Sequence, residues 1–150
     1  MTKTIILSVC FATFLLSLDA RAQVQRRYGN GPVTEVDYIA VGYGHFDEYM
    51  AWVTSTWVPT MEAAKKAGLI IDYKVFRASP KLPDQPNMYL EITYKNMAAY
   101  AGDIGDKADD FEAVTEKVIC GSACQNQARV HRNEFRKVLG TEVIRELVFK

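Results

Sequence analysis

The stretch LIIDYKVFRASPKLPDQPNMYLEITYK, from Leu69 to Lys95, decides the fold of this chain. Apolar and polar side chains alternate at both of its ends, and a period of two residues is typical of half-buried β-strands. The connector between the ends carries Pro80, Pro83 and Pro86, which interrupt regular structure. The stretch therefore predicts a β-hairpin with one apolar face, built from Leu69, Ile71, Tyr73 and Val75 in the first strand and from Met88, Leu90, Ile92 and Tyr94 in the second.

Further strands and helices are predicted on both sides of the hairpin. Before it, β-branched and aromatic residues predict a strand over 33–43, and apolar residues at helical spacing predict a helix over 46–67. Pro59 has no backbone N–H to donate, so we expect a kink or a break there, with Pro59 in the first turn of a second segment. After the hairpin we expect a helical turn over 97–100, helices over 106–119 and 122–139, and a last strand over 141–149.

The order of these elements is β-α-β-β-α-β, with several helical pieces in the second helix position. Right-handed crossovers arrange this order as a ferredoxin-like α+β fold, a four-stranded antiparallel sheet covered by helices on one face. The first and third strands are then central, and the second and fourth lie at the edges. The uncovered face suits contact with a partner because it mixes polar and aromatic residues, namely Asp72, Lys74, Phe76, Tyr89, Glu91 and Thr93.

The first 22 residues have the form of a cleavable signal peptide. Lys3 gives a basic start, residues 5–18 are almost entirely apolar, and Ala20-Arg21-Ala22 matches a signal-peptidase site. A membrane-spanning helix needs about 20 apolar residues, so the shorter run favours cleavage after Ala22 over a retained anchor. We therefore predict a secreted or periplasmic protein without a membrane contact after cleavage, with a flexible linker over 23–32 and one domain over 33–150.

Charge and cysteine content narrow the classes of function. The chain has 18 basic and 18 acidic residues, and removal of the first 22 residues leaves a net charge of about −1, which argues against a nucleic-acid-binding protein. Two of the three cysteines, Cys120 and Cys124, stay in the mature chain. In an oxidising compartment we expect them to form a disulfide bond. A redox-active pair is the alternative, although their spacing is not that of a CxxC motif.

The mature chain resembles the dimeric α+β barrel superfamily, which includes the antibiotic-biosynthesis monooxygenase, EthD-like and NIPSNAP-like families. The resemblance rests on the element order, on the aromatic-rich FDEYMAWVTSTWVPTM segment followed by LIIDYKVF and MYLEITYK, and on the closing VIRELVF strand. The chain is also similar to small exported bacterial proteins without an assigned activity. The resemblance implies a homodimer that pairs sheet to sheet, with a ligand cavity between the sheet and the helices of each subunit. No residues match the catalytic Asn, Trp and His of the haem-degrading branch.

The residues predicted to line such a cavity come from the first helix, the hairpin and the last helix. They are Trp57, Met61, Tyr73, Tyr94 and His131. The same residues could form a solid core, because aromatic residues and Met at helical spacing usually do. His131 and His45, which lies at the start of the first helix, are the candidate catalytic residues.

Three functions remain open at this point. The first is a homodimeric binding protein for a small apolar or aromatic molecule. The second is a cofactor-independent monooxygenase or isomerase, in which His131 or His45 is the base and Tyr73 or Tyr94 orients the substrate. The third is a structural or interaction protein without a ligand.

Neither a cofactor nor a metal is predicted. The two histidines lie far apart in the sequence, and the acidic run over 103–110 lacks the ligand spacing of a calcium loop. The basic stripe formed by Arg129, Arg132 and Arg136 is interpreted as a solvent-exposed helix face.

Overall fold

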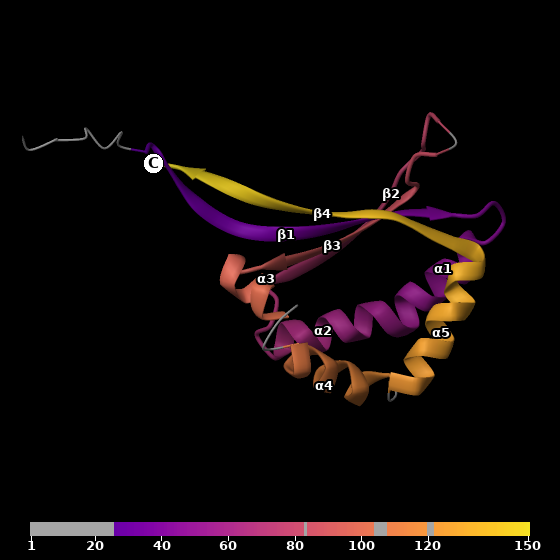
Figure 1. The fold of residues 1–150 in the computed structure, drawn as a ribbon. Coiled ribbons are helices and arrows are strands. Elements are labelled where there is room, and N and C mark those ends of the chain that lie inside the picture. Colours follow the sequence, from indigo (N-terminus) through magenta and orange to yellow (C-terminus); the bar gives the residue numbers. More distant parts are fainter. Residues whose placement is uncertain (1–25, 83, 104–107, 120–121) are drawn as a thin grey trace, which may run out of the picture.

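The computed structural model describes residues 26–82, 84–103, 108–119 and 122–150 (Figure 1). Its four strands form one antiparallel sheet in the order β2-β3-β1-β4, and the helices lie on one side of it. This is the predicted ferredoxin-like α+β fold, with the first and third strands central. The strands are β1 (Tyr28–Val41), β2 (Asp72–Arg77), β3 (Met88–Tyr94) and β4 (Arg136–Phe149).

The register of the sheet confirms which side chains share the open face. Phe76 and Tyr38 both lie opposite Tyr89, and Val36 lies opposite Glu91. The rings of Tyr38 and Tyr89 meet edge to face at 5.5 Å, and the Tyr38 hydroxyl donates a hydrogen bond to Glu142 across the β1–β4 pair. All six residues predicted for this face lie on it, because successive side chains of a strand point to opposite faces.

The first helical segment is continuous but not α-helical throughout. Helix α1 (Phe46–Trp52) passes into a π-helical turn, η1 (Val53–Trp57), and then into α2 (Val58–Lys66). Pro59 lies in the first turn of α2, as predicted. Because the preceding turn is itself helical, its missing N–H leaves one helical hydrogen bond unmade, and the segment continues without a break. The segment ends at Gly68, whose φ of 76° is a left-handed conformation that glycine adopts without steric cost.

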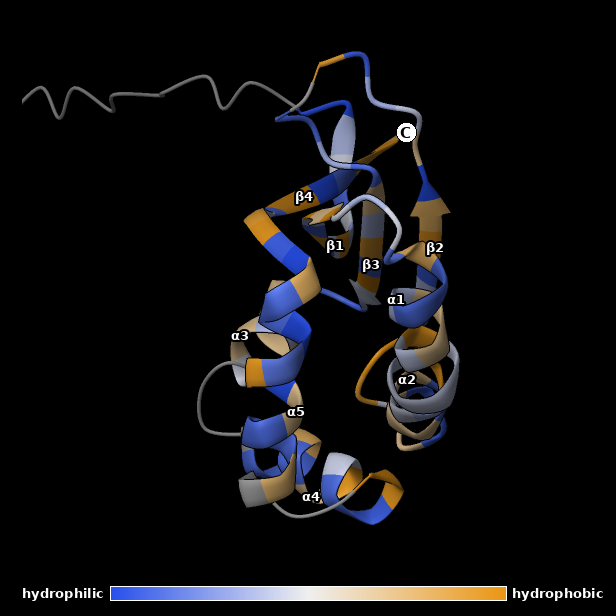
Figure 2. Ribbon diagram, turned by 90° about the vertical axis from the view of Figure 1, so that its right-hand side faces the viewer, coloured by the Kyte–Doolittle hydropathy of each residue, from blue (hydrophilic) through white to orange (hydrophobic). Residues whose placement is uncertain are grey.

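Three helices occupy the second helix position, namely α3 (Met97–Asp103), α4 (Ala108–Val118) and α5 (Ser122–Phe135). Asn96 caps α3, since its Oδ1 accepts a 2.9 Å hydrogen bond from the Ala99 N–H. Helix α4 contacts α2, and α5 leads directly into β4. In Figure 2, α5 lies below the β4 edge of the sheet and the α1–α2 segment lies below the β2 edge, on the same face. Helix α4 lies between them at the end farthest from the sheet.

The core lies between the sheet and the α1–α2 segment. Ile39 in β1 and Ala64 in α2 are fully buried, and Leu90 and Met88 bring the apolar face of the hairpin into the same cluster. The cluster also holds Val41, Tyr49, Val53, Trp57, Met61, Ile70, Tyr94 and Phe135.

Several strand boundaries differ from the prediction. Strand β2 begins at Asp72 instead of Leu69, so Ile71 lies outside it and is 44% exposed, whereas Ile70 is buried in the core. Strand β1 ends at Val41 instead of Tyr43.

Strand β1 begins at Tyr28 instead of Val33, so the predicted linker over 23–32 is too long: the end of β4 supplies a partner, with Tyr28 opposite Phe149. Strand β4 begins at Arg136, so α5 ends at Phe135 and Gly140 lies inside the strand instead of ending a helix. Pairing with β1 decides the start of β4, because the helical spacing of the sequence continues past the point where the ladder begins.

Candidate functional site

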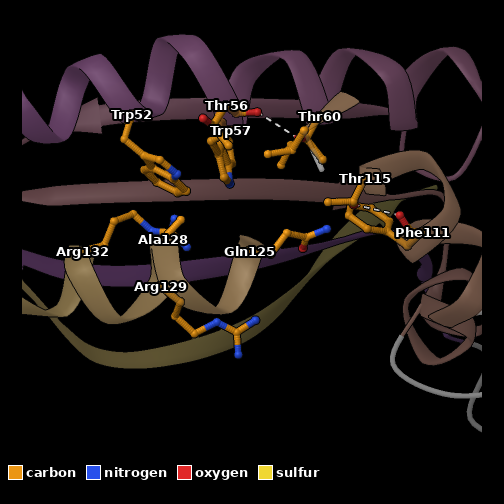
Figure 3. A pocket seen from close by; sticks show the side chains of 11 residues that line it. Trp52, Thr56, Trp57, Thr60, Phe111, Thr115, Gln125, Ala128, Arg129 and Arg132 are labelled. Carbon is orange, nitrogen blue, oxygen red and sulfur yellow. Dashed lines mark hydrogen bonds between the residues drawn. The ribbon is translucent and has the colours of Figure 1, made fainter. Parts of the chain in front are cut away.

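A cavity of about 210 Å³ lies between the α1–α2 segment and helices α4 and α5. Figure 3 shows side chains from both sides pointing toward one another across it. The first wall is built from Trp52, Thr56, Trp57 and Thr60, and the opposite wall from Phe111, Thr115, Ile119, Gln125, Ala128, Arg129 and Arg132. The cavity therefore lies between two groups of helices, whereas the predicted cavity lay between the sheet and the helices.

The π-helical turn brings both tryptophans to this cavity. In an α-helix, residues five apart point about 140° away from each other, because each residue turns the helix by about 100°. In η1 the Val58 N–H donates to the Val53 carbonyl, an i to i+5 bond that widens the turn. Trp52 and Trp57 consequently line the same wall.

Trp57 is held from behind by the sheet. Its ring meets the ring of Tyr73 edge to face, with centroids 5.4 Å apart. The Tyr73 hydroxyl donates a hydrogen bond to Glu62 of α2, and this bond raises the pKa of Tyr73 to about 12. Trp57 thus has a fixed position in the wall.

Arg132 is the charged side chain that points at the aromatic wall. Its guanidinium carbon lies 4.3 Å from the centroid of the Trp52 ring, which is cation–π distance. Arg136 approaches the same ring at 5.2 Å. Burial, together with the neighbouring charges of Arg136 and Arg129, lowers the pKa of Arg132 to about 10. The guanidinium remains charged at neutral pH.

Of the five residues predicted to line a cavity, Trp57 lines this one. Met61 and Tyr94 are buried in the core, and Tyr94 meets the ring of Tyr100 edge to face. Tyr73 lies behind Trp57. His131 is solvent-exposed and touches Phe135 with the edge of its ring, so its predicted place on a buried stripe of α5 is wrong.

His45 lies away from this cavity, at the start of α1. Its Nδ1 is 2.9 Å from Glu48 Oε2, and its ring stacks on Phe135 at 5.8 Å. It borders a separate surface hollow with Gly42 and Arg136. The structure therefore brings neither candidate base to the aromatic cavity.

The interpretation of the arginines as a solvent-exposed stripe is wrong for Arg132. Helix α5 carries Ala128 and Arg132 on its inward side, because it faces η1 and the Trp52 end of α1 across the cavity instead of packing against the sheet. In Figure 3 the guanidinium of Arg132 points toward Trp52, while that of Arg129 points away. The signal in the sequence was Trp52, an aromatic partner for a cation on the facing helix.

Several other predictions fall partly or wholly outside the described residues. Cys120 lies outside them, so its disulfide bond with Cys124 stays a prediction. Within the described ranges, no group of three His, Cys, Asp or Glu side chains is arranged to hold a metal ion. In that same part of the chain, no helix is both long and apolar enough to span a bilayer.

No protein-family description and no curated protein matches the chain. Among solved structures, HapK from Hahella chejuensis is similar at 15% identity, covering 76% of this chain and 91% of that one with a TM-score of 0.49. A dimeric ferredoxin-like protein from an uncultured marine organism is similar at 15% identity, covering 80% and 96% with a TM-score of 0.47. At this identity the similarity concerns the fold alone.

Proposed function

We propose that the mature protein is an exported homodimer that binds a small, largely apolar molecule in the cavity between α1–α2 and α4–α5. The proposal rests on the aromatic and apolar side chains that line the cavity. The indole rings of Trp52 and Trp57 form one wall, and Phe111, Ile119 and Ala128 contribute apolar surface to the other. Aromatic walls with few polar groups are typical of small-molecule sites.

The volume of the cavity limits the size of the ligand. An engineered apolar cavity of about 150 Å³ accommodates benzene. A cavity of about 210 Å³ therefore suits a molecule with one or two fused rings.

Isothermal titration calorimetry with 2-naphthamide, a neutral two-ring probe, tests this proposal. We expect measurable binding to the native protein and a loss of at least about tenfold in affinity for Ala128→Leu, because the larger side chain fills the cavity. Ala113→Leu is the matched control, since Ala113 is exposed on α4 and should leave the affinity unchanged. Absence of binding to the native protein, or equal losses in both variants, would contradict the proposal and favour a structural protein without a ligand.

The homodimer is supported by the exposure of β4. All of its residues after Arg136 are exposed in the single chain, and Figure 2 shows apolar stretches along it. Exposed apolar side chains gathered along one edge of a sheet mark an interaction surface. A second copy that pairs its open sheet face with this one would cover the face that carries Tyr38, Tyr89 and Ile144.

Export rests on residues 1–22, which lie outside the described residues. We expect the mature protein from its own host to begin at Gln23. Intact-mass measurement checks this, and a protein that retains the first 22 residues would contradict it.

The monooxygenase or isomerase alternative gains no support from this cavity. In the described part of the chain, His131 and His45 both lie outside its lining. Tyr94, which was predicted to orient a substrate, is buried in the core.

A further inference from the structure

We infer that the ligand of this cavity is a flat organic acid whose carboxylate binds Arg132 beside the Trp52 ring. The inference rests on the proposed binding function and names the chemical class of the ligand. The ligand's rings would lie between Trp57 and Ala128, and its charged group would lie at the Trp52 end of the cavity. The groups that recognise the charge are hydrogen-bond donors that lack an acceptor.

Four buried side-chain atoms in the described part of the chain have no hydrogen-bond partner, and they belong to one cluster. They are Tyr49 Oη, Trp52 Nε1, Arg132 Nε and Arg136 Nε. The rings of Tyr49 and Trp52 lie 5.6 Å apart, and both guanidinium groups lie within cation–π distance of Trp52. Three of the four atoms can only donate, and a tyrosine hydroxyl can also donate. The Tyr49 hydroxyl can also accept and interacts with Arg136, whereas Trp52 Nε1 and Arg132 Nε have no acceptor in the described part of the chain.

The cluster also carries uncompensated positive charge. No carboxylate in the described part of the chain pairs with Arg132 or Arg136 within 4 Å, and the ion pairs found there, His45–Glu48 and Lys65–Asp72, lie elsewhere. Burial raises the pKa of Tyr49, the interaction with Arg136 opposes this rise, and the charge of Asp37 adds to it. Asp37 itself accepts a hydrogen bond from Thr141 at 2.5 Å. Arg136 and Arg129 repel the charge of Arg132.

A buried donor without an acceptor is costly, and more so when it is charged. An anionic ligand in the cavity would compensate the charge of Arg132, whose side chain lines it. A carboxylate fits best, because its two oxygens match the planar fork of a guanidinium. The Trp52 ring holds one face of the Arg132 guanidinium and leaves its edge for hydrogen bonding.

The hydroxyl groups of Thr60 and Thr115, which also line the cavity, are not available to bind the carboxylate. The Thr60 hydroxyl donates to the Thr56 carbonyl at 2.8 Å, and the Thr115 hydroxyl donates to the Phe111 carbonyl at 2.8 Å. Both hydroxyl protons are therefore used within their own helices. The Arg129 guanidinium points away from Trp52 in Figure 3.

The test compares two probes of the same shape, 2-naphthoate and 2-naphthamide, by calorimetry at pH 7 on the unmodified protein. We expect 2-naphthoate to bind at least about tenfold more tightly, because charge-assisted hydrogen bonds exceed neutral ones. This comparison needs no variant, so it does not depend on the folding of a mutant. Equal affinities would overturn the inference while leaving the proposed binding function intact. Failure of both probes to bind would overturn both.

Variants then identify the charged side chain that causes the preference for 2-naphthoate. Arg132→Gln should abolish the preference for 2-naphthoate over 2-naphthamide, and Arg132→Lys should keep part of that preference. Arg27→Gln, at the exposed start of the chain's described part, removes the same charge far from the cavity and should keep the full preference. A preference that survives Arg132→Gln, or disappears in Arg27→Gln, would overturn the assignment to Arg132.

Discussion

The guanidinium of Arg132 lies over the ring of Trp52, with 4.3 Å between the guanidinium carbon and the ring centroid. This contact joins α5 to the α1–α2 segment across the Trp52 end of the cavity. It also explains how a half-buried arginine is accommodated without a carboxylate partner in the described part of the chain, because the face of an indole ring attracts a cation.

We expect the Trp52–Arg132 contact to contribute a coupling free energy of about 0.5–2 kcal/mol to stability. A double-mutant cycle of Trp52→Leu and Arg132→Met, measured by urea unfolding, checks this value. The contact of Lys65 with Tyr73 provides a weaker cation–π pair for comparison, because the Lys65 Nζ lies 5.9 Å from the centroid of the Tyr73 ring. Strictly additive effects of the two cavity substitutions would show that the contact is energetically neutral.

The open sheet face should form the dimer interface. Ile144→Asp puts a charge on this face and should shift the protein to a monomer in sedimentation velocity. Val143→Asp is the matched control, because Val143 is its neighbour in β4, is comparably exposed and points to the opposite face. A dimer that tolerates Ile144→Asp but not Val143→Asp would place the interface on the helix side of β4.

Met61 belongs to the core, so its truncation should affect stability without affecting the cavity. It is 3% exposed, and we expect Met61→Ala to cost about 2–5 kcal/mol in the free energy of unfolding. The affinity for 2-naphthamide should stay unchanged under conditions in which the variant is folded. A loss of affinity for 2-naphthamide in the folded variant would show that Met61 contributes to the ligand site.

Tyr73 should titrate at a higher pH than an ordinary tyrosine, with a pKa of about 12, because its hydroxyl donates to Glu62. The folded state holds this proton more tightly than the unfolded state. The stabilising contribution is therefore complete below pH 10 and is lost as the pH rises toward 12. Ultraviolet titration of the native protein and of Glu62→Gln checks this, and an unchanged titration in the variant would contradict it.

Gly68→Ala should destabilise the protein by about 1 kcal/mol. The residue ends α2 at a φ of 76°, and a β-carbon there would meet no other atoms within 4 Å, so the cost is one of backbone conformation and not of crowding. Gly29→Ala is the control, because Gly29 has equally open surroundings and its φ is not positive. Urea unfolding that shows equal costs for both would contradict this reason.

Much of the fold follows from local patterns in the sequence. The alternation over 69–95 predicted the hairpin and assigned Asp72, Lys74 and Glu91 to the open face, which the register confirms. The position of Pro59 and the Asn96 cap also follow from local chemistry, since each depends on hydrogen bonds among neighbouring residues. Such features need no knowledge of distant contacts.

The site could not be predicted in the same way. Whether Arg132 or His131 faces inward depends on where α5 lies relative to α1 and η1, and adjacent residues on a helix differ by about 100° in direction. Tertiary packing placed α5 beside Trp52 instead of against the sheet, which buried the Arg132 side chain and exposed His131.

The length of β4 was likewise decided by a partner distant in sequence. The ladder with β1 begins with Val41 opposite Arg136, and it overrode a helical pattern that continued to Val138. The sequence by itself determined the order of the elements, the Asn96 cap and the faces of the hairpin residues from Asp72 onward, because these depend on neighbours in the chain. Only the tertiary structure decided where the cavity lies and which side chains carry its charge, because these depend on how separate helices pack.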